Sequence, residues 1–333
     1  MADIEVQSVQ KSEVKKIISD ARSFCSFEEI MERTHLSAEE LTDILIKLRQ
    51  SGFRTFQCEK NNDVFLCSSE RYVEENNYIQ KIENNGYPLK ILINSDYHKG
   101  SAYDKPKFED AKNEFEIKNN IKYEINLGDY IEGYPYHTAK TYPGKLRYQP
   151  SLENELRYLN TTLMVNPQVS TFLLYGNHDI FTLNGISRDF LKDYEAIYRK
   201  TGILPCGIED TKFQINNDFI RLVHKNHSEF TTECKKIEFK YENQLIFGGH
   251  SHIANTEDRF GYHLEVIPTL SGLEHKSNNG LVFYNGFLVV TLIFDENKLI
   301  KEAIMDPYRL HEGVSEPEHL PSNYVEVRRY KNK

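Results

Sequence analysis

Several short pieces of this sequence place aspartate, histidine and asparagine directly after apolar runs. In chain order they are Ser95-Asp96-Tyr97-His98, Gly128-Asp129, Gly176-Asn177-His178-Asp179, His224 and Gly249-His250-Ser251-His252. An apolar run followed by polar residues is typical of a buried strand that ends at a cleft, so all the pieces can point into one site. Carboxylate, imidazole and amide groups without thiolates favour a pair of divalent cations that activate water against a phosphate ester.

The elements that must position these residues follow an α/β pattern from Leu89 onward, where strands alternate with helices. The expected strands of this first part are 89–94, 123–127 and 171–175, with helices near 108–119, 152–165 and 189–200. Short antiparallel strands are then expected at 212–215, 219–223, 245–247, 264–267, 281–284, 287–294 and 299–305. Two sheets, each faced by helices, accommodate this order.

Residues 1–80 differ in pattern from the rest of the chain. Ser26 with Glu29, and Ser37 with Glu40, match the capping box that opens a helix. We expect three helices, over 12–21, 27–34 and 38–50, and then a hairpin of strands 54–59 and 64–67. This order resembles a winged helix-turn-helix module.

Such a module either binds DNA through its third helix or serves as a docking or dimerisation unit. Residues 1–80 contain 10 Lys and Arg against 15 Asp and Glu. The start of the third helix carries Glu39, Glu40 and Asp43, which phosphates repel. The charge therefore disfavours DNA reading by this helix and leaves a homo-oligomer through the N-terminal domain as the alternative.

The predicted domain boundaries follow from these changes in pattern. Residues 1–80 form the winged-helix-like domain, 81–88 a linker, 89–308 the catalytic domain and 309–333 a C-terminal surface extension.

Composition restricts the class of protein further. The chain has 333 residues, a net charge of −9 and 5 scattered cysteines without a CxxC pair, which indicates reduced thiols. The N-terminus lacks the apolar core of a signal peptide, and the longest apolar stretch, Phe287–Phe294, is too short to span a membrane. We expect a cytoplasmic protein without membrane association.

The ordered motifs DxH, GD, GNHD, a single His and GHxH resemble those of the calcineurin-like metallophosphoesterase superfamily, over roughly residues 89–305. The resemblance implies a two-sheet α/β/β/α sandwich. It also implies a dinuclear site in which one metal is held by Asp96, His98 and His252 and the other by Asn177, His224 and His250, with Asp129 bridging both.

In the same resemblance, a hydroxide shared by the metals is the nucleophile. His178 stabilises the transition state or protonates the leaving group, and Asp179 orients His178. The cofactors are two divalent cations, with Mn²⁺ favoured and Fe, Zn²⁺ and Mg²⁺ as alternatives.

The sequence departs from the family where Lys225 follows the single His, a position at which the family often has Gly. Lys225 is a candidate contact for a substrate phosphate or a plain loop residue. Tyr134 and His137, shortly after Gly128-Asp129, are further candidates for substrate contact, with a surface loop as the alternative.

Substrate identity is left open by these motifs. The first hypothesis is a phosphodiesterase or nuclease acting on DNA, RNA or nucleotides, favoured by the N-terminal module and by the SDxHxG form at 95–100. The second is a phosphomonoesterase of small molecules or phosphoproteins, favoured by the acidic charge. The third is a non-catalytic docking or regulatory protein, disfavoured because every ligand of the motif set is present.

Overall fold

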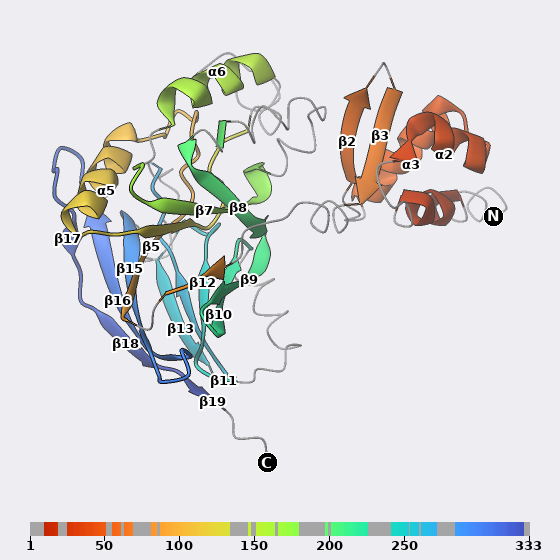
Figure 1. The fold of residues 1–333 in the computed structure, drawn as a ribbon. Helices are drawn as coiled ribbons and strands as arrows, with labels where there is room; N and C mark the ends of the chain where they lie inside the picture. Colours follow the sequence, from red (N-terminus) through yellow and green to blue (C-terminus); the bar gives the residue numbers. More distant parts are fainter. Residues whose placement is uncertain are drawn as a thin grey trace. The chain divides into compact units, whose positions relative to one another are not determined.

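The computed structural model describes residues 10–18, 25–50, 55–60, 63–68, 81–84, 87–133, 146–147, 151–163, 166–179, 197–198, 201–225, 241–252, 254–259, 261–271 and 284–329. The chain divides into two compact units, Met1–Asn77 with Thr182–Ala196 and Tyr78–Phe181 with Ile197–Lys333, and each has its own hydrophobic core (Figure 1). No helix within these described ranges is long and apolar enough to cross a membrane.

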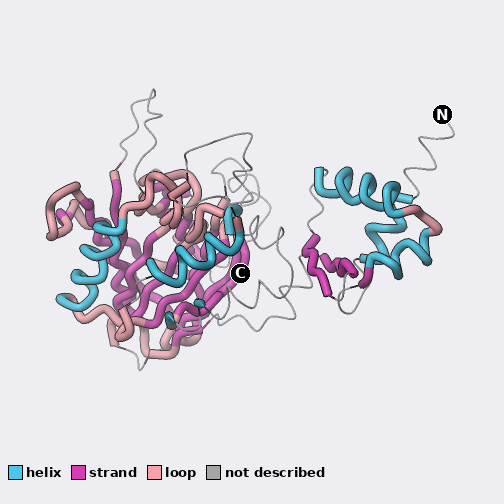
Figure 2. Tube along the Cα trace, turned by 90° about the horizontal axis from the view of Figure 1, so that it is seen from above, coloured by secondary structure: helices cyan, strands magenta, loops and turns pink. Residues whose placement is uncertain are grey.

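The N-terminal unit combines helices with a small antiparallel sheet of order β1-β3-β2 (Figure 2). In chain order its elements are a helix over residues 10–18, β1 (Cys25–Ser26), α2 (Phe27–Thr34), α3 (Ala38–Gln50), β2 (Thr55–Lys60) and β3 (Asp63–Ser68). The predicted helices and hairpin occur in this order, while the winged-helix identity of the unit stays a prediction.

The capping box at Ser37 and Glu40 forms with both of its hydrogen bonds, and at Ser26 the serine half of the predicted box is present. Ser26 Oγ accepts a hydrogen bond from the backbone N–H of Glu29 at 2.9 Å. Ser37 Oγ accepts from the N–H of Glu40 at 3.3 Å, and Glu40 Oε2 accepts from the N–H of Ser37 at 2.8 Å. Each cap satisfies a backbone donor that the first helical turn leaves open, which stabilises the helix by about 1 kcal/mol.

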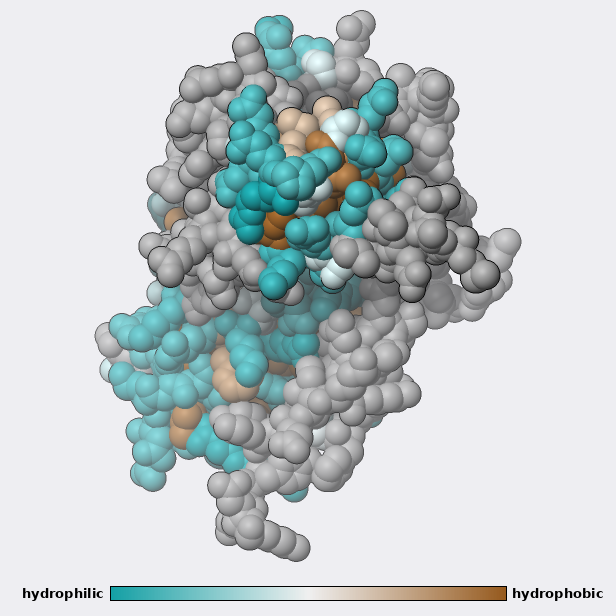
Figure 3. Space-filling view, turned by 90° about the vertical axis from the view of Figure 1, so that its right-hand side faces the viewer, coloured by the Kyte–Doolittle hydropathy of each residue, from teal (hydrophilic) through white to brown (hydrophobic). Residues whose placement is uncertain are grey.

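Helix α3 buries one apolar face and exposes a charged one. Leu41, Ile44 and Leu48 are at most 5% exposed and pack in the core of this unit. The outer face of the helix carries the exposed residues Glu39, Glu40, Thr42, Asp43, Ile46 and Lys47. On the face that Figure 3 shows, described hydrophilic residues, drawn in teal, surround a smaller area of hydrophobic residues, drawn in brown. The α3 face is therefore acidic, as the sequence predicts.

The second unit is mixed α/β with two main sheets, which confirms the predicted fold class. The larger sheet has the order β17-β16-β15-β5-β6-β7-β8, with β18 also paired to β16. Its strands are β5 (Leu89–Asn94), β6 (Tyr123–Asn126), β7 (Ser170–Tyr175), β8 (Ile203–Ile208), β15 (Asn285–Phe294), β16 (Ile300–Leu310), β17 (Glu318–His319) and β18 (Asn323–Glu326). From β5 to β8 the strands are parallel, so their carboxyl ends share one edge.

The smaller sheet has the order β13-β14-β12-β10-β9-β4. Its strands are β4 (Lys81–Ile82), β9 (Asp210–Ile215), β10 (Asp218–Val223), β12 (Gln244–Gly248), β13 (Asn255–Arg259) and β14 (Tyr262–Val266). β10 and β12 are parallel neighbours, so the residues that follow them also lie side by side. A separate two-stranded sheet pairs β11 (Tyr241–Glu242) with β19 (Arg328–Arg329).

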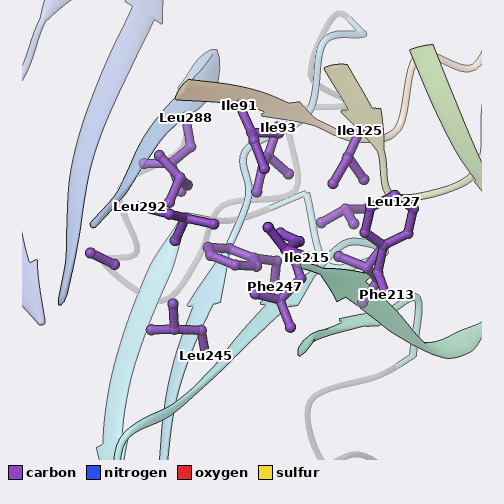
Figure 4. Close-up of a cluster of buried hydrophobic side chains, with 14 of the residues drawn as sticks. Ile91, Ile93, Ile125, Leu127, Phe213, Ile215, Leu245, Phe247, Leu288 and Leu292 are labelled. Atoms are coloured by element: carbon purple, nitrogen blue, oxygen red, sulfur yellow. The ribbon is translucent and has the colours of Figure 1, made fainter. Parts of the chain in front are cut away.

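The two main sheets enclose the principal core. Figure 4 shows Ile91 and Ile93 of β5 above Phe247 of β12, with side chains of both sheets turned toward one another. Alternate residues of a strand point to the same face, so this core takes every second residue of β5 and leaves the other face to the helices. The helices of this unit include α5 (Pro106–Lys118) and α6 (Leu152–Thr162).

Some predicted boundaries differ from the structure. β4 lies in the segment predicted as linker 81–88, and its Ile82 is buried in the core between the sheets. β18 and β19 lie in the segment predicted as a surface extension, and Val325 joins the same core. The second unit thus includes both flanking segments as strands, and an apolar residue of each lies in its core. The predicted strand 281–284 and the helix 189–200 lie mostly outside the described residues.

Candidate metal centre

All the predicted ligands sit immediately after parallel strands. In the larger sheet Asp96 and His98 follow β5, Asp129 follows β6, and Asn177 follows β7. In the smaller sheet His224 follows β10, and His250 and His252 follow β12. The carboxyl ends of parallel strands are where α/β proteins bind ligands.

The ligands form two groups with a carboxylate in each. In the first, His252 Nε2 lies 3.2 Å from Asp96 Oδ1 and 3.0 Å from His98 Nε2. His98 Nε2 lies 3.8 Å from the same Asp96 oxygen. This grouping is the one that the resemblance implies for the first metal.

In the second group, Asn177 Oδ1 lies 2.8 Å from His250 Nδ1 and 3.1 Å from His224 Nε2. Asp129 Oδ2 lies 3.0 Å from His224 Nε2 and 4.0 Å from His98 Nε2. The Asp129 carboxylate therefore faces an imidazole of each group, which is the place required of a bridging ligand.

These separations fit shared cations. Two ligand atoms that are each about 2.1 Å from one ion lie about 3.0–3.4 Å apart. Asp96 Oδ2 accepts from Ser95 Oγ at 2.5 Å and from the N–H of His250 at 3.0 Å. Its other oxygen, Oδ1, is buried and accepts no hydrogen bond in the described part of the chain. An unsatisfied buried carboxylate oxygen facing imidazoles suits a metal ion.

The backbone reaches this arrangement at some conformational cost. Left-handed φ values, which are uncommon for residues with a side chain, occur at the ligands Asp96 (55°), His98 (46°), Asp129 (49°), His250 (80°) and His252 (58°). Such strain gathers at functional sites, where the surrounding structure holds it. Gly176 shows how closely the segments approach, because a Cβ there would lie 2.3 Å from Asp129 Oδ1.

Glu132 is a functional residue that the sequence analysis did not identify. Its Oε2 lies 2.7 Å from His98 Nδ1, and its backbone carbonyl accepts from His178 Nδ1 at 2.7 Å. A carboxylate behind a metal-binding histidine fixes the orientation and tautomer of the ring. Glu132 thus holds both His98 and His178, and the three side chains form a further cluster whose ligand atoms lie close enough together to bind a metal ion. Its position three residues after Asp129, in the loop that follows the same strand, is the sequence feature that could have indicated Glu132 as a candidate.

His178 lies beside the ligands, with its ring centroid 4.7 Å from that of His98 in an edge-on contact. Its partner differs from the prediction, because the Glu132 carbonyl rather than Asp179 holds its Nδ1. The Asp179 carboxylate instead accepts hydrogen bonds from the backbone N–H groups of Gly176, Tyr130 and Ile131. Asp179 thus ties together the loops after β6 and β7, and its role as the residue that orients His178 is corrected.

Burial and neighbouring carboxylates set the proton affinity of the imidazoles. Burial disfavours a charged His98, but the Glu132 carboxylate outweighs it and raises the pKa of His98 to about 9. Asp129 similarly raises the pKa of His224 to about 10 against the effect of burial. The pKa of His178 is lowered, chiefly by burial. Metal ligation requires neutral imidazole, so cations compete with protons at this site.

The structure describes only one of the three residues that were predicted to contact the substrate. Tyr134 and His137 lie outside the described residues. Lys225 is half-buried at the end of β10, where its Nζ lies 3.3 Å from Asp210 Oδ2. The same carboxylate accepts two hydrogen bonds from Arg221. Contact between Lys225 and a phosphate stays a prediction.

Comparison with known proteins adds one relative. The chain matches no protein-family model. It is 22% identical over 254 residues, 74% of this chain and 83% of the relative, to an uncharacterized metallophosphoesterase from Aquifex aeolicus (strain VF5). This similarity supports homology to metallophosphoesterases.

Solved structures give weaker likenesses. Vacuolar Protein Sorting 29 from Cryptosporidium parvum is 15% identical with a TM-score of 0.39, and covers 72% of this chain and 98% of its own. YfcE, a phosphoesterase from E. coli, is 18% identical with a TM-score of 0.37, and covers 64% and 96%. At such scores the fold assignment depends on the sheet topology of the chain itself.

Proposed function

We propose that this protein is a dinuclear metal-dependent phosphoric ester hydrolase. The observation that carries the proposal is the pair of ligand groups with Asp129 between them, at 3.0 Å from His224 and 4.0 Å from His98. Asp96, His98 and His252 hold one divalent cation; Asn177, His224 and His250 hold the other. Bound cations of this kind polarise a phosphoryl oxygen and make water nucleophilic at neutral pH.

The protein's own residues orient these groups and handle the proton. Glu132 holds His98 through its carboxylate and His178 through its carbonyl. Because a carbonyl only accepts, His178 Nδ1 carries a proton and the ring orientation is fixed. Only the doubly protonated ring can then donate a proton from Nε2 to the leaving oxygen, because Nε2 of the neutral ring carries a lone pair. Mn²⁺ is the favoured cation, with Fe, Zn²⁺ and Mg²⁺ as alternatives.

Within this class the first candidate substrate is a phosphodiester in a nucleic acid or nucleotide. The order of three helices and a hairpin in the N-terminal unit supports it. The second candidate is a phosphomonoester, and the acidic outer face of α3 favours that one, because Glu39, Glu40 and Asp43 repel a phosphate backbone. In the second case the N-terminal unit serves oligomerisation.

A substrate panel tests the proposal. The full chain, loaded with Mn²⁺, is assayed on bis-p-nitrophenyl phosphate, p-nitrophenyl phosphate and labelled DNA, with a chelator-treated sample as the control. Metal-dependent cleavage of the diester and of DNA is the expected result. Cleavage of the monoester alone would reject the nuclease assignment, and no cleavage of any ester by the metal-loaded protein would reject hydrolase function.

A further inference from the structure

A fully buried carboxylate lies beneath the strand ends that carry the ligands. Glu124 of β6 is 2% exposed. Its Oε1 accepts hydrogen bonds from Asn94 Nδ2, from Lys112 Nζ at 2.7 Å and from Tyr97 OH at 3.2 Å. Its Oε2 accepts from Thr171 Oγ1 at 2.8 Å. Every contact of this carboxylate is thus made with a donor.

The donors come from separate elements, most of which lead into the metal centre. Asn94 ends β5, and Tyr97 stands between the ligands Asp96 and His98. Thr171 belongs to β7, which leads to Asn177. Lys112 belongs to α5. One side chain therefore connects the parallel strands β5, β6 and β7 with the helix beside them.

A directed chain of amides continues from Glu124 to the loop that carries Asp129. The backbone N–H of Gly128 donates to Asn126 Oδ1 at 3.0 Å, and Asn126 Nδ2 donates to Asn94 Oδ1 at 2.7 Å. Asn94 Nδ2 then donates to Glu124. Because a backbone N–H can only donate, the chain has one direction and must end on an acceptor.

An ionised carboxylate is the side chain that fits this end point, since it accepts hydrogen bonds and donates none. An amide in its place would keep one acceptor oxygen for Asn94 but would lose the charge that pairs with Lys112 and the oxygen that accepts from Thr171. Burying the charge is costly unless it is paired, and Lys112 supplies the pairing. Lys112 also contacts Glu116 Oε1 at 3.0 Å. The pKa of Glu124 is lowered: burial alone would raise it, but Lys112 and the other donors outweigh that effect.

We propose that Glu124 is a positioning residue of the metal centre, and that its carboxylate fixes the Gly128–Asp129 loop relative to Asp96 and His98 through Asn94 and Asn126. The inference depends on the proposed function, because positioning matters only if these residues bind the cations. It adds a residue that touches no ligand side chain and acts through the hydrogen-bond chain.

The test compares Glu124→Gln with Glu116→Gln. Both residues are buried and pair with Lys112, but in the described part of the chain the hydrogen bonds to Asn94 and Thr171 are made by Glu124 and not by Glu116. Mn²⁺ affinity is measured by titration calorimetry. The values of kcat and KM are measured with bis-p-nitrophenyl phosphate as the substrate, and folding is checked by circular dichroism. We expect Glu124→Gln to bind Mn²⁺ about 10-fold more weakly and to lose kcat rather than raise KM. Glu116→Gln should keep the wild-type metal affinity.

Equal metal affinity in the two variants, at either the wild-type or the weakened value, would overturn the positioning role. If Glu124→Gln does not fold, Asn126→Ala decides, because it cuts the chain and leaves the Glu124–Lys112 pair intact. A folded Asn126→Ala protein with wild-type Mn²⁺ affinity overturns the inference; about 10-fold weaker binding supports it. A wild-type protein that binds no Mn²⁺ would instead overturn the proposed function, and this inference with it.

Discussion

The two main sheets contribute different chemistry to the candidate metal centre. The larger sheet supplies both carboxylates and the amide, and buried side chains such as Glu132 and Asn94 stand behind its ligands. The smaller sheet supplies only imidazoles, and His224 Nδ1 donates to the carbonyl of Leu127 in the larger-sheet layer at 2.6 Å. The larger sheet thus carries the negative charge and the supporting hydrogen bonds, while the smaller sheet adds imidazoles, of which His224 is oriented by that carbonyl.

The largest effect on the metal centre is expected at Asp129 of the larger sheet, whose carboxylate lies between the two ligand groups. We expect Asp129→Asn to lose at least one cation and more than about 100-fold in kcat/KM, because a neutral amide cannot offset the repulsion of two cations. Metal content by elemental analysis and diester hydrolysis measure this. Asp110→Asn, exposed on α5, is the control. Full metal content in Asp129→Asn would contradict its bridging role.

A substitution at His178, which follows a strand of the larger sheet, distinguishes proton transfer from metal binding. We expect His178→Ala to reduce kcat about 100-fold with unchanged metal content, because the ring stabilises charge and holds no cation. Metal content is measured by elemental analysis and kcat by diester hydrolysis. A parallel loss of metal would show that His178 is a ligand.

Glu132 tests whether side-chain support matters for the ligands of the larger sheet. Glu132→Gln keeps the backbone carbonyl that holds His178 but weakens the contact with His98 Nδ1. Second-sphere carboxylates of this kind contribute 10–100-fold, and we expect Mn²⁺ affinity to fall by about 10-fold. Calorimetric titration measures the change, with Glu265→Gln on β14 as a control outside both ligand groups. Unchanged affinity would show that the loop alone orients His98.

The smallest effect is expected at Glu116, a buried residue of α5 that belongs to neither ligand group. Burial, reinforced by Glu124, raises the pKa of Glu116 from 4.5 to about 7. A carboxyl whose folded pKa is raised favours folding when it is protonated, so its ionisation costs stability as the pH rises from about 4.5 to 7. Glu116→Gln should therefore show a flatter dependence of Tm on pH between 5 and 8 than the wild type. A steeper dependence, measured by thermal denaturation, would contradict the assigned shift.

Much of the site was predictable because ligand types and strand ends are local features of the sequence. Asp96, Asp129 and His224 each follow a run of apolar residues, and the structure places each at the end of a strand. The assignment of Asp179 to His178 was wrong because neighbours in sequence need not face each other. Residues 177–179 form a helical turn, on which successive side chains point in different directions.

Elements with interrupted patterns were harder to predict. β8 contains Pro205 and Gly207, which are unfavourable inside a strand, and no strand was expected there. The structure places β8 at the edge of the larger sheet, where proline is tolerated. β4 is very short, and its partner β9 lies far away in the sequence. β18 is also short and pairs with β16, which ends at Leu310.

The sequence by itself determined the chemical types of the ligands, their order and their attachment to strand ends, because these depend on local hydrophobic pattern. Only the tertiary structure decided which ligand atoms lie close enough to share a cation, since that depends on two sheets approaching across one core. It also decided that Glu124 and Glu132 are buried in contact with Asn94 and His98. A glutamate on a strand or loop is ordinarily solvated, and only packing against distant segments buries it among donors.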